Sequence, residues 1–166
     1  MMNKQIVIVT AIFSLLCSVA SAQSKKANDI DNYNYEVQFV KVGLQGTILF
    51  KIYSYGKNQE SCIENAKLNA VKAVIFKGIP GSDLQRPMVS ESGAEDKYRD
   101  FFQLFFQKSG KYLRFVSISG DGSINPDDRF KVGKNYKIGV VVAVQKADLR
   151  KELEDAGIIK KLGDGF

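Results

Sequence analysis

The chain has 166 residues, with 24 Lys and Arg against 18 Asp and Glu, and it contains neither histidine nor tryptophan. Without histidine, a Ser/His/Asp triad, a Cys/His dyad and a histidine-bearing zinc site are excluded. The net charge of +6 is modest and spread along the chain, and no basic block interleaved with aromatic residues stands out, so we expect no nucleic-acid partner.

The first 22 residues have the pattern of a secretory signal peptide. Lys4 supplies the charged region, residues 6–16 the apolar region, and Ala20-Ser21-Ala22 a cleavage site of small residues. This pattern predicts a mature chain that begins at Gln23. We therefore expect an exported protein, either periplasmic or secreted.

Lipoprotein processing at Cys17 is the alternative for this segment. Leu16 stands where that pathway needs a small residue, so we expect Cys17 to be removed with the signal. The apolar run is also shorter than the roughly 20 residues that cross a bilayer core. No later stretch approaches that length, and we predict no transmembrane segment after cleavage.

Loss of Cys17 leaves Cys62 as the one cysteine, so the mature monomer has no internal disulfide. Cys62 falls at the start of a predicted helix, where a helix N-terminus can lower a thiol pKa. Because no histidine is present to act as its base, we expect an ordinary half-buried thiol, with an intermolecular disulfide as the alternative.

The mature chain is long enough for one domain, which we place at residues 34–166 after a flexible leader at residues 23–33. The domain opens with two β-rich runs, residues 36–42 and 47–53, separated by a glycine-bounded loop that predicts a hairpin. Apolar residues then recur at helical spacing over residues 61–77, and Gly78-Ile-Pro-Gly81 ends that helix.

A loop at residues 82–93 precedes a second predicted helix at residues 95–108. This helix carries four phenylalanines within six residues, Phe101, Phe102, Phe105 and Phe106. Such a group most often fills the space between a helix and a sheet. The alternative is an exposed ridge that binds a partner, and these four residues are our candidate interface.

Residues 111–119 and 136–145 are predicted strands, and the second is apolar on both alternating sets of positions. It should therefore be the central strand, with both faces covered. A last helix is expected at residues 148–155, with Arg150 beside Glu154 and Gly157 at its end. The order β-β-α-α-β-β-α predicts a single α+β domain, with about four antiparallel or mixed strands and two to three helices packed on the sheet.

The loop at residues 119–128 is the best local candidate for a site, because Asp121, Ser123, Asn125 and Asp127 alternate as oxygen ligands do in calcium loops. Pro126 and Val132 stand where a calcium-binding helix-loop-helix needs glycine and glutamate. The same residues are typical of a long turn between strands. No carboxylate pair has a spacing that indicates catalysis, and we assign no catalytic residue, metal site or cofactor.

Together, the opening strands, the helix around Glu64-Asn-Ala-Lys-Leu-Asn-Ala-Val-Lys-Ala-Val74, the Phe-rich helix and the closing Val-rich strand resemble secreted proteins of Bacteroidota. Their order is also similar to that of the small α+β domain of Helicobacter lipoprotein twenty and the N-terminal domain of flagellar protein T. The resemblance covers residues 36–145 and implies an envelope or surface-assembly module without catalysis.

Two functions stay open from the sequence. The first is a non-enzymatic binding or assembly module that docks an envelope protein through a sheet edge, the long loop or exposed phenylalanines. The second is an enzyme or a small-ligand or calcium carrier with a site in residues 82–93 or 119–128, which predicts a concave pocket where carboxylates converge. The absence of histidine favours the first.

Overall fold

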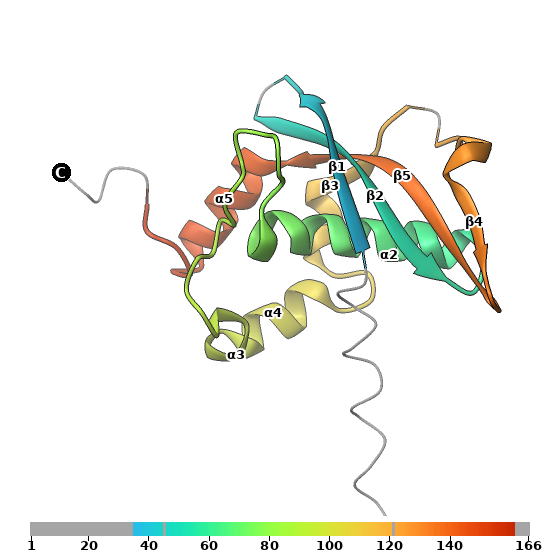
Figure 1. The fold of residues 1–166 in the computed structure, drawn as a ribbon. Coiled ribbons are helices and arrows are strands. Elements are labelled where there is room, and N and C mark those ends of the chain that lie inside the picture. Colours follow the sequence, from blue (N-terminus) through green and yellow to red (C-terminus); the bar gives the residue numbers. More distant parts are fainter. Residues whose placement is uncertain (1–34, 45, 121, 162–166) are drawn as a thin grey trace, which may run out of the picture. The chain divides into compact units, whose positions relative to one another are not determined.

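The computed structural model describes residues 35–44, 46–120 and 122–161. The predicted signal peptide, with Cys17, and the predicted leader at residues 23–33 lie outside these ranges. The described residues form an α+β domain in which an antiparallel sheet is packed against helices, which confirms the predicted fold class (Figure 1).

The sheet is built around one long hairpin and one central strand. Strands β1 (Tyr35–Val42) and β2 (Thr47–Gly56) form the predicted hairpin, and β2 pairs along its whole length with β5 (Asn135–Gln145). The far edge of β5 pairs with β3 (Val116–Ile118) at one end and with β4 (Arg129–Val132) at the other. The predicted central position of β5 is therefore confirmed.

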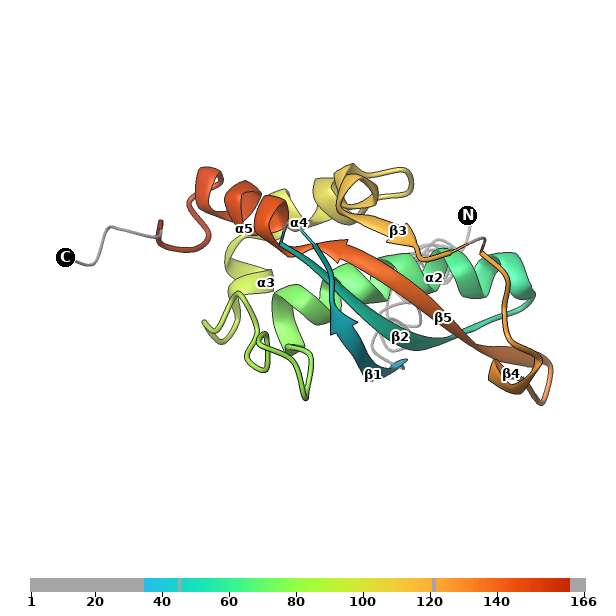
Figure 2. The same ribbon diagram turned by 90° about the horizontal axis from the view of Figure 1, so that it is seen from above.

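Helix α2 (Gln59–Lys72) covers one face of this sheet, which we call the inner face (Figures 1 and 2). Asn58 caps the helix by accepting from the Ser61 amide, and the Ser61 side chain reciprocates in a capping box. The buried residues that pack there from β2 and β5 alternate along each strand: Ile48, Phe50, Ile52, Ile138, Val140, Val142 and Val144.

The prediction that both faces of β5 are covered is wrong. The positions that face away from α2, on the outer face, are half-buried in β2 and β5 (Leu49, Lys51, Tyr53, Val141 and Ala143). On this face the apolar residues of β5 are Val141 and Ala143, which are register partners of Lys51 and Leu49 on β2.

The predicted helix at residues 61–77 ends in a π-helical turn, η2 (Ala73–Lys77), before Gly78 takes a φ of +81°. The loop that follows is tied to this turn through its backbone. The amides of Met88 and Val89 donate to the carbonyls of Val74 and Ile75, at 3.2 and 2.9 Å. Two carbonyls that the helix end leaves without intrahelical partners are thereby satisfied.

The second predicted helix is two helices, α3 (Ala94–Lys97) and α4 (Arg99–Phe106), because the backbone leaves helical geometry at Tyr98. The predicted strand at residues 111–119 is also wrong in its first half. There a 3₁₀ helix, η3 (Lys111–Phe115), brings Tyr112 and Phe115 to the core, a spacing of three that matches the 3₁₀ repeat.

The C-terminal part of the described chain agrees more closely with prediction. Helix α5 (Lys146–Asp155) begins two residues before the predicted start, and Arg150 pairs with Glu154 at 2.9 Å, as its spacing predicts. Gly157 follows the helix with a φ of +68°. A short 3₁₀ turn, η4 (Pro126–Asp128), and strand β4 were not predicted.

Candidate functional site

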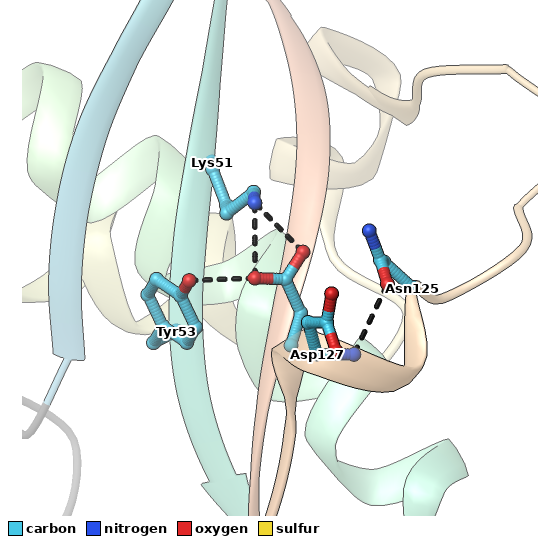
Figure 3. A network of polar contacts seen from close by, with 5 residues as sticks. Lys51, Tyr53, Asn125 and Asp127 are labelled. Carbon is cyan, nitrogen blue, oxygen red and sulfur yellow. Dashed lines mark hydrogen bonds and ion pairs between the residues drawn. The ribbon is translucent and has the colours of Figure 1, made fainter.

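The loop predicted as a calcium site closes with a capped turn. Asn125 is the N-cap of η4, and its side-chain oxygen accepts from the Asp127 amide at 3.0 Å (Figure 3). Asp121 lies outside the described residues. In the part of the chain that the structure describes, no group of three or more His, Cys, Asp or Glu side chains is placed to hold a metal ion. The arrangement matches the turn interpretation of this segment.

The carboxylate that the turn does present is Asp128, which points to the outer face of the sheet. One of its oxygens accepts from Lys51 Nζ at 2.9 Å and from the Tyr53 hydroxyl at 2.6 Å, and the other lies 2.7 Å from Lys51 Nζ (Figure 3). The Asp128 side chain is only 11 % exposed. These contacts join segments 75 to 77 residues apart and fix the turn over strand β2.

The protonation states in this network are fixed by its contacts. Burial alone would raise the pKa of Asp128, but the hydrogen bonds from Lys51 and Tyr53, with the Lys51 charge, lower it below its ordinary value. The hydrogen bond to Asp128 is the main cause that raises the pKa of Tyr53 to about 12, and burial adds to it. At neutral pH the acid is ionised and the phenol is protonated.

Around Tyr53 the outer face gathers aromatic and basic groups. Lys137 Nζ lies 5.1 Å from the Tyr53 ring and 5.9 Å from the Tyr55 ring, and it donates to Glu36 at 2.6 Å. The Phe130 ring lies 6.3 Å from that of Tyr53. We call this set, Lys51, Tyr53, Tyr55, Phe130 and Lys137, the outer-face cluster.

Gly139 of β5 makes the position of Tyr53 possible. The two residues are register partners, and a Cβ on Gly139 would lie 2.6 Å from the nearest ring atom of Tyr53. The absence of a side chain therefore lets the ring lie flat across β5, where its hydroxyl reaches Asp128. The fold therefore requires glycine at position 139, and the sequence pattern alone does not reveal this requirement.

Phe130 and Val132 are the exposed apolar residues of this end of the sheet, at 45 % and 47 % exposure. Sequence reasoning missed them because β4 was not predicted. The signal that could have found them is the alternation in Arg129-Phe-Lys-Val132, a basic and apolar repeat of period two. This segment has one aromatic residue between two basic ones, and the expectation of no nucleic-acid partner stays a prediction.

The four phenylalanines predicted as a candidate interface all take part in core packing. Phe102 and Phe105 are buried, at 3 % and 2 % exposure, and Phe101 and Phe106 are half-buried against them. The Phe102 ring meets the Phe76 ring edge-on at 5.0 Å. The packing agrees with the core interpretation of this helix, and partner binding through the remaining exposed parts of Phe101 and Phe106 stays a prediction.

Cys62 lies in the first part of α2 and is completely buried rather than half-buried. Its thiol donates to the Tyr136 carbonyl at 3.4 Å, and burial raises its pKa. A thiol in this position is protonated at neutral pH and is covered by the sheet. An intermolecular disulfide would require α2 to separate from β5 first.

The loop at residues 82–93, the other predicted site, is held by contacts within itself and with neighbouring segments. Ser82 is buried, donates to the Ile79 carbonyl at 2.7 Å and accepts from the Leu84 amide at 3.0 Å, while Asp83 pairs with Lys146. A groove of about 430 Å³ lies elsewhere, along α2, lined by Gln59, Glu60, Ile63, Glu64 and Lys67. Neither predicted loop contributes to that groove.

Comparisons with protein-family models, with curated proteins and with solved structures give no match. The resemblance to the secreted Bacteroidota proteins and to the lipoprotein-twenty and flagellar protein T domains therefore stays a prediction. Among the described residues, every helix is too short or too polar to cross a bilayer.

Proposed function

We propose that this protein is an exported, non-enzymatic binding module of the bacterial cell envelope and that it binds through the outer-face cluster. The observation that carries the proposal is the set of half-buried and exposed aromatic and basic side chains held in place by the Lys51, Asp128 and Tyr53 contacts. Side chains fixed before binding lose little conformational entropy on binding.

The electrostatics of the cluster favour binding over catalysis. Asp128 has both oxygens engaged and a lowered pKa, which makes it a weak general base at neutral pH. Tyr53, with its pKa raised to about 12, is a weak acid. The ionisable groups thus serve to fix geometry, and the surface they fix is aromatic, with Lys51 and Lys137 each held in an ion pair.

The other docking modes considered from the sequence have less support. Strand β1 is a sheet edge, but its pairing is interrupted by a bulge between Phe39 and Lys41, and lysine and bulges are common protections of an edge against strand addition. The other long loop is closed by its own hydrogen bonds. The outer-face cluster is neither a protected sheet edge nor a loop closed by hydrogen bonds.

Binding is tested with a washed envelope preparation and the chain expressed from Gln23. We expect the native chain to co-sediment with the envelope and the double variant Tyr55→Ser, Phe130→Ser to lose at least tenfold in binding. Leu104→Ser is the matched control, because Leu104 is 66 % exposed on α4. Circular dichroism confirms that each variant is folded. Equal binding by all three chains, or none by the native chain, would contradict the proposal.

Export is tested separately by expressing the full chain in a Gram-negative host and sequencing the N-terminus of the product. We expect processed protein that begins at Gln23 in the periplasm or medium. A full-length product that stays in the cytoplasm would contradict this part of the proposal and leave the binding experiment unaffected.

A further inference from the structure

The hairpin of β4 and β5 concentrates positive charge at one end of the domain. Residues 129–137 contain Arg129, Lys131, Lys134 and Lys137, and no acidic residue occurs between Arg129 and Ala147. In Figures 1 and 2 the hairpin lies at the end of the sheet opposite α5. The strand β4 is exposed at all four of its positions.

Only part of this charge is neutralised. Lys137 pairs with Glu36, and the nearby acid Asp128 is engaged by Lys51. Arg129 bonds to the neutral side chain of Gln59 at 2.8 Å. Within residues 35–44, 46–120 and 122–161, Lys131 and Lys134 have no ion pair, so the tip of the hairpin carries uncompensated positive charge.

Apolar side chains alternate with these cations along β4. Phe130 and Val132 are two residues apart on β4, so they project to the same face, the outer one, where Phe130 meets Tyr53. Arg129 and Lys131 alternate with them and project to the opposite face, where Arg129 reaches Gln59 of α2. Nearly half of each side chain is exposed. Exposed apolar residues flanked by lysine and arginine are the composition that binds the interface of an anionic membrane.

We propose that the β4–β5 hairpin docks this domain on an anionic lipid bilayer. The free edge of β4 meets the bilayer, since among the described strands β4 pairs only with β5. Phe130 and Val132, on one side of the strand, enter the boundary between head groups and acyl chains, and Lys131 on the other side and Lys134 in the turn contact the lipid phosphates. This inference rests on the proposed function, because Phe130 belongs to the outer-face cluster and the bilayer is the envelope component that it would bind.

A single-stranded nucleic acid is the competing occupant, since it also attracts cations and aromatic rings. The rings of the cluster are poorly placed for it: Lys137 lies over both Tyr53 and Tyr55, and the Tyr53 hydroxyl is bound to Asp128. The aliphatic Val132 offers nothing to a stacking base, whereas it suits a lipid interface. Charge and exposure together favour the bilayer.

The test is co-sedimentation of the chain expressed from Gln23 with protein-free vesicles of equal parts phosphatidylglycerol and phosphatidylethanolamine. Because each cation near an anionic surface contributes about a fivefold gain in partitioning, we expect Lys131→Gln with Lys134→Gln to lose roughly 25-fold. The control pair Lys108→Gln with Lys151→Gln removes the same charge from exposed positions elsewhere and should change binding less than threefold.

A second variant separates insertion from charge. Phe130→Ser with Val132→Ser keeps every lysine and should lower vesicle binding about tenfold. Equal binding to phosphatidylcholine vesicles, equal losses in the two lysine pairs, or tighter binding to a single-stranded oligonucleotide would overturn the inference. If vesicle binding is absent while envelope binding persists, the lipid inference fails and the proposed binding function stands; if both are absent, both fail.

Discussion

The phenylalanines of α4 and the phenylalanine of β4 have opposite environments. Phe102 and Phe105 are among four aromatic residues in six and lie in the core, whereas Phe130 stands alone between Arg129 and Lys131 and is 45 % exposed. Neighbouring rings on one helix pack on one another, whereas an apolar side chain on a strand that is paired along one edge only is left partly exposed. The place of the element in the fold, more than the number of aromatic residues, indicates which aromatic surface is free to bind.

The largest effect is expected in the core. Phe102→Ala should lower the free energy of unfolding by about 3–5 kcal/mol, because it removes a buried ring and leaves a cavity beside Phe76. Urea unfolding followed by circular dichroism measures the change. A cost no larger than that of Phe130→Ala would erase the distinction between the two groups.

The network on the outer face should contribute less. Asp128→Asn removes the charge that Lys51 and Tyr53 contact and should cost about 2 kcal/mol at neutral pH. Asp127→Asn is the matched control, since the Asp127 side chain is exposed and its backbone amide makes the turn contact. We expect the control to change stability by at most about 0.5 kcal/mol. Equal costs would show that the network does not fix the turn.

Acid should weaken the same network. The pKa of Asp128 is lowered by folding, so its contribution is complete above the ordinary carboxyl pKa and is lost as the pH falls through the lowered value. Asp128→Asn lacks that contribution at every pH, and its stability curve should approach that of the native chain in acid. Parallel curves down to the acid limit would contradict the assignment.

Alkali should act through Tyr53. Folding raises its pKa to about 12, so the protonated phenol stabilises the fold fully below its ordinary pKa of 10.0 and progressively less as the pH rises toward 12. Tyr53→Phe should lose less stability over that range than the native chain does. Tyrosinate absorbance measures the ionisation of the phenols, and urea unfolding measures the stability. Burial and the Glu95 charge also raise the pKa of Tyr35 to about 12, so Tyr35 accounts for part of the pH dependence that remains in the variant.

The smallest effects belong to the exposed apolar residues. Phe130→Ser should cost at most about 1 kcal/mol, because its ring contact with Tyr53 is partly solvated. Leu104→Ser, on the same helix as the buried phenylalanines, should cost about 0.5 kcal/mol or less. Thermal unfolding measures both. A large loss at Phe130 would place it with the core residues.

The elements with strong local patterns were predicted from the sequence, and those without them were not. The helix after Asn58 and the strand at Ile138 to Val144 have long apolar patterns that tertiary contacts reinforce. Strand β4 has four exposed residues, and the 3₁₀ helix at Lys111–Phe115 has the aromatic and aliphatic content of a strand. For strand β4 and for this 3₁₀ helix, packing against the rest of the domain decides the backbone conformation, and the local sequence does not.

The candidate site was harder to predict because its contacts are distant in the chain. Lys51 and Asp128 are separated by 77 residues, and neither lies in a motif of its own. The calcium pattern drew attention to the correct turn but to the wrong acid, since Asp128 does not belong to the alternating set. Gly139 had no distinguishing signal at all before its register with Tyr53 was known.

The π-helical turn at Ala73–Lys77 has a consequence for how the chain can vary. The loop after it is attached by backbone groups, the amides of Met88 and Val89 on the carbonyls of Val74 and Ile75. Such contacts are indifferent to the side chains of those residues but depend on the spacing between them. This region should therefore accept many substitutions but not the insertion or deletion of a single residue. Its length is constrained more strongly than the identity of its residues.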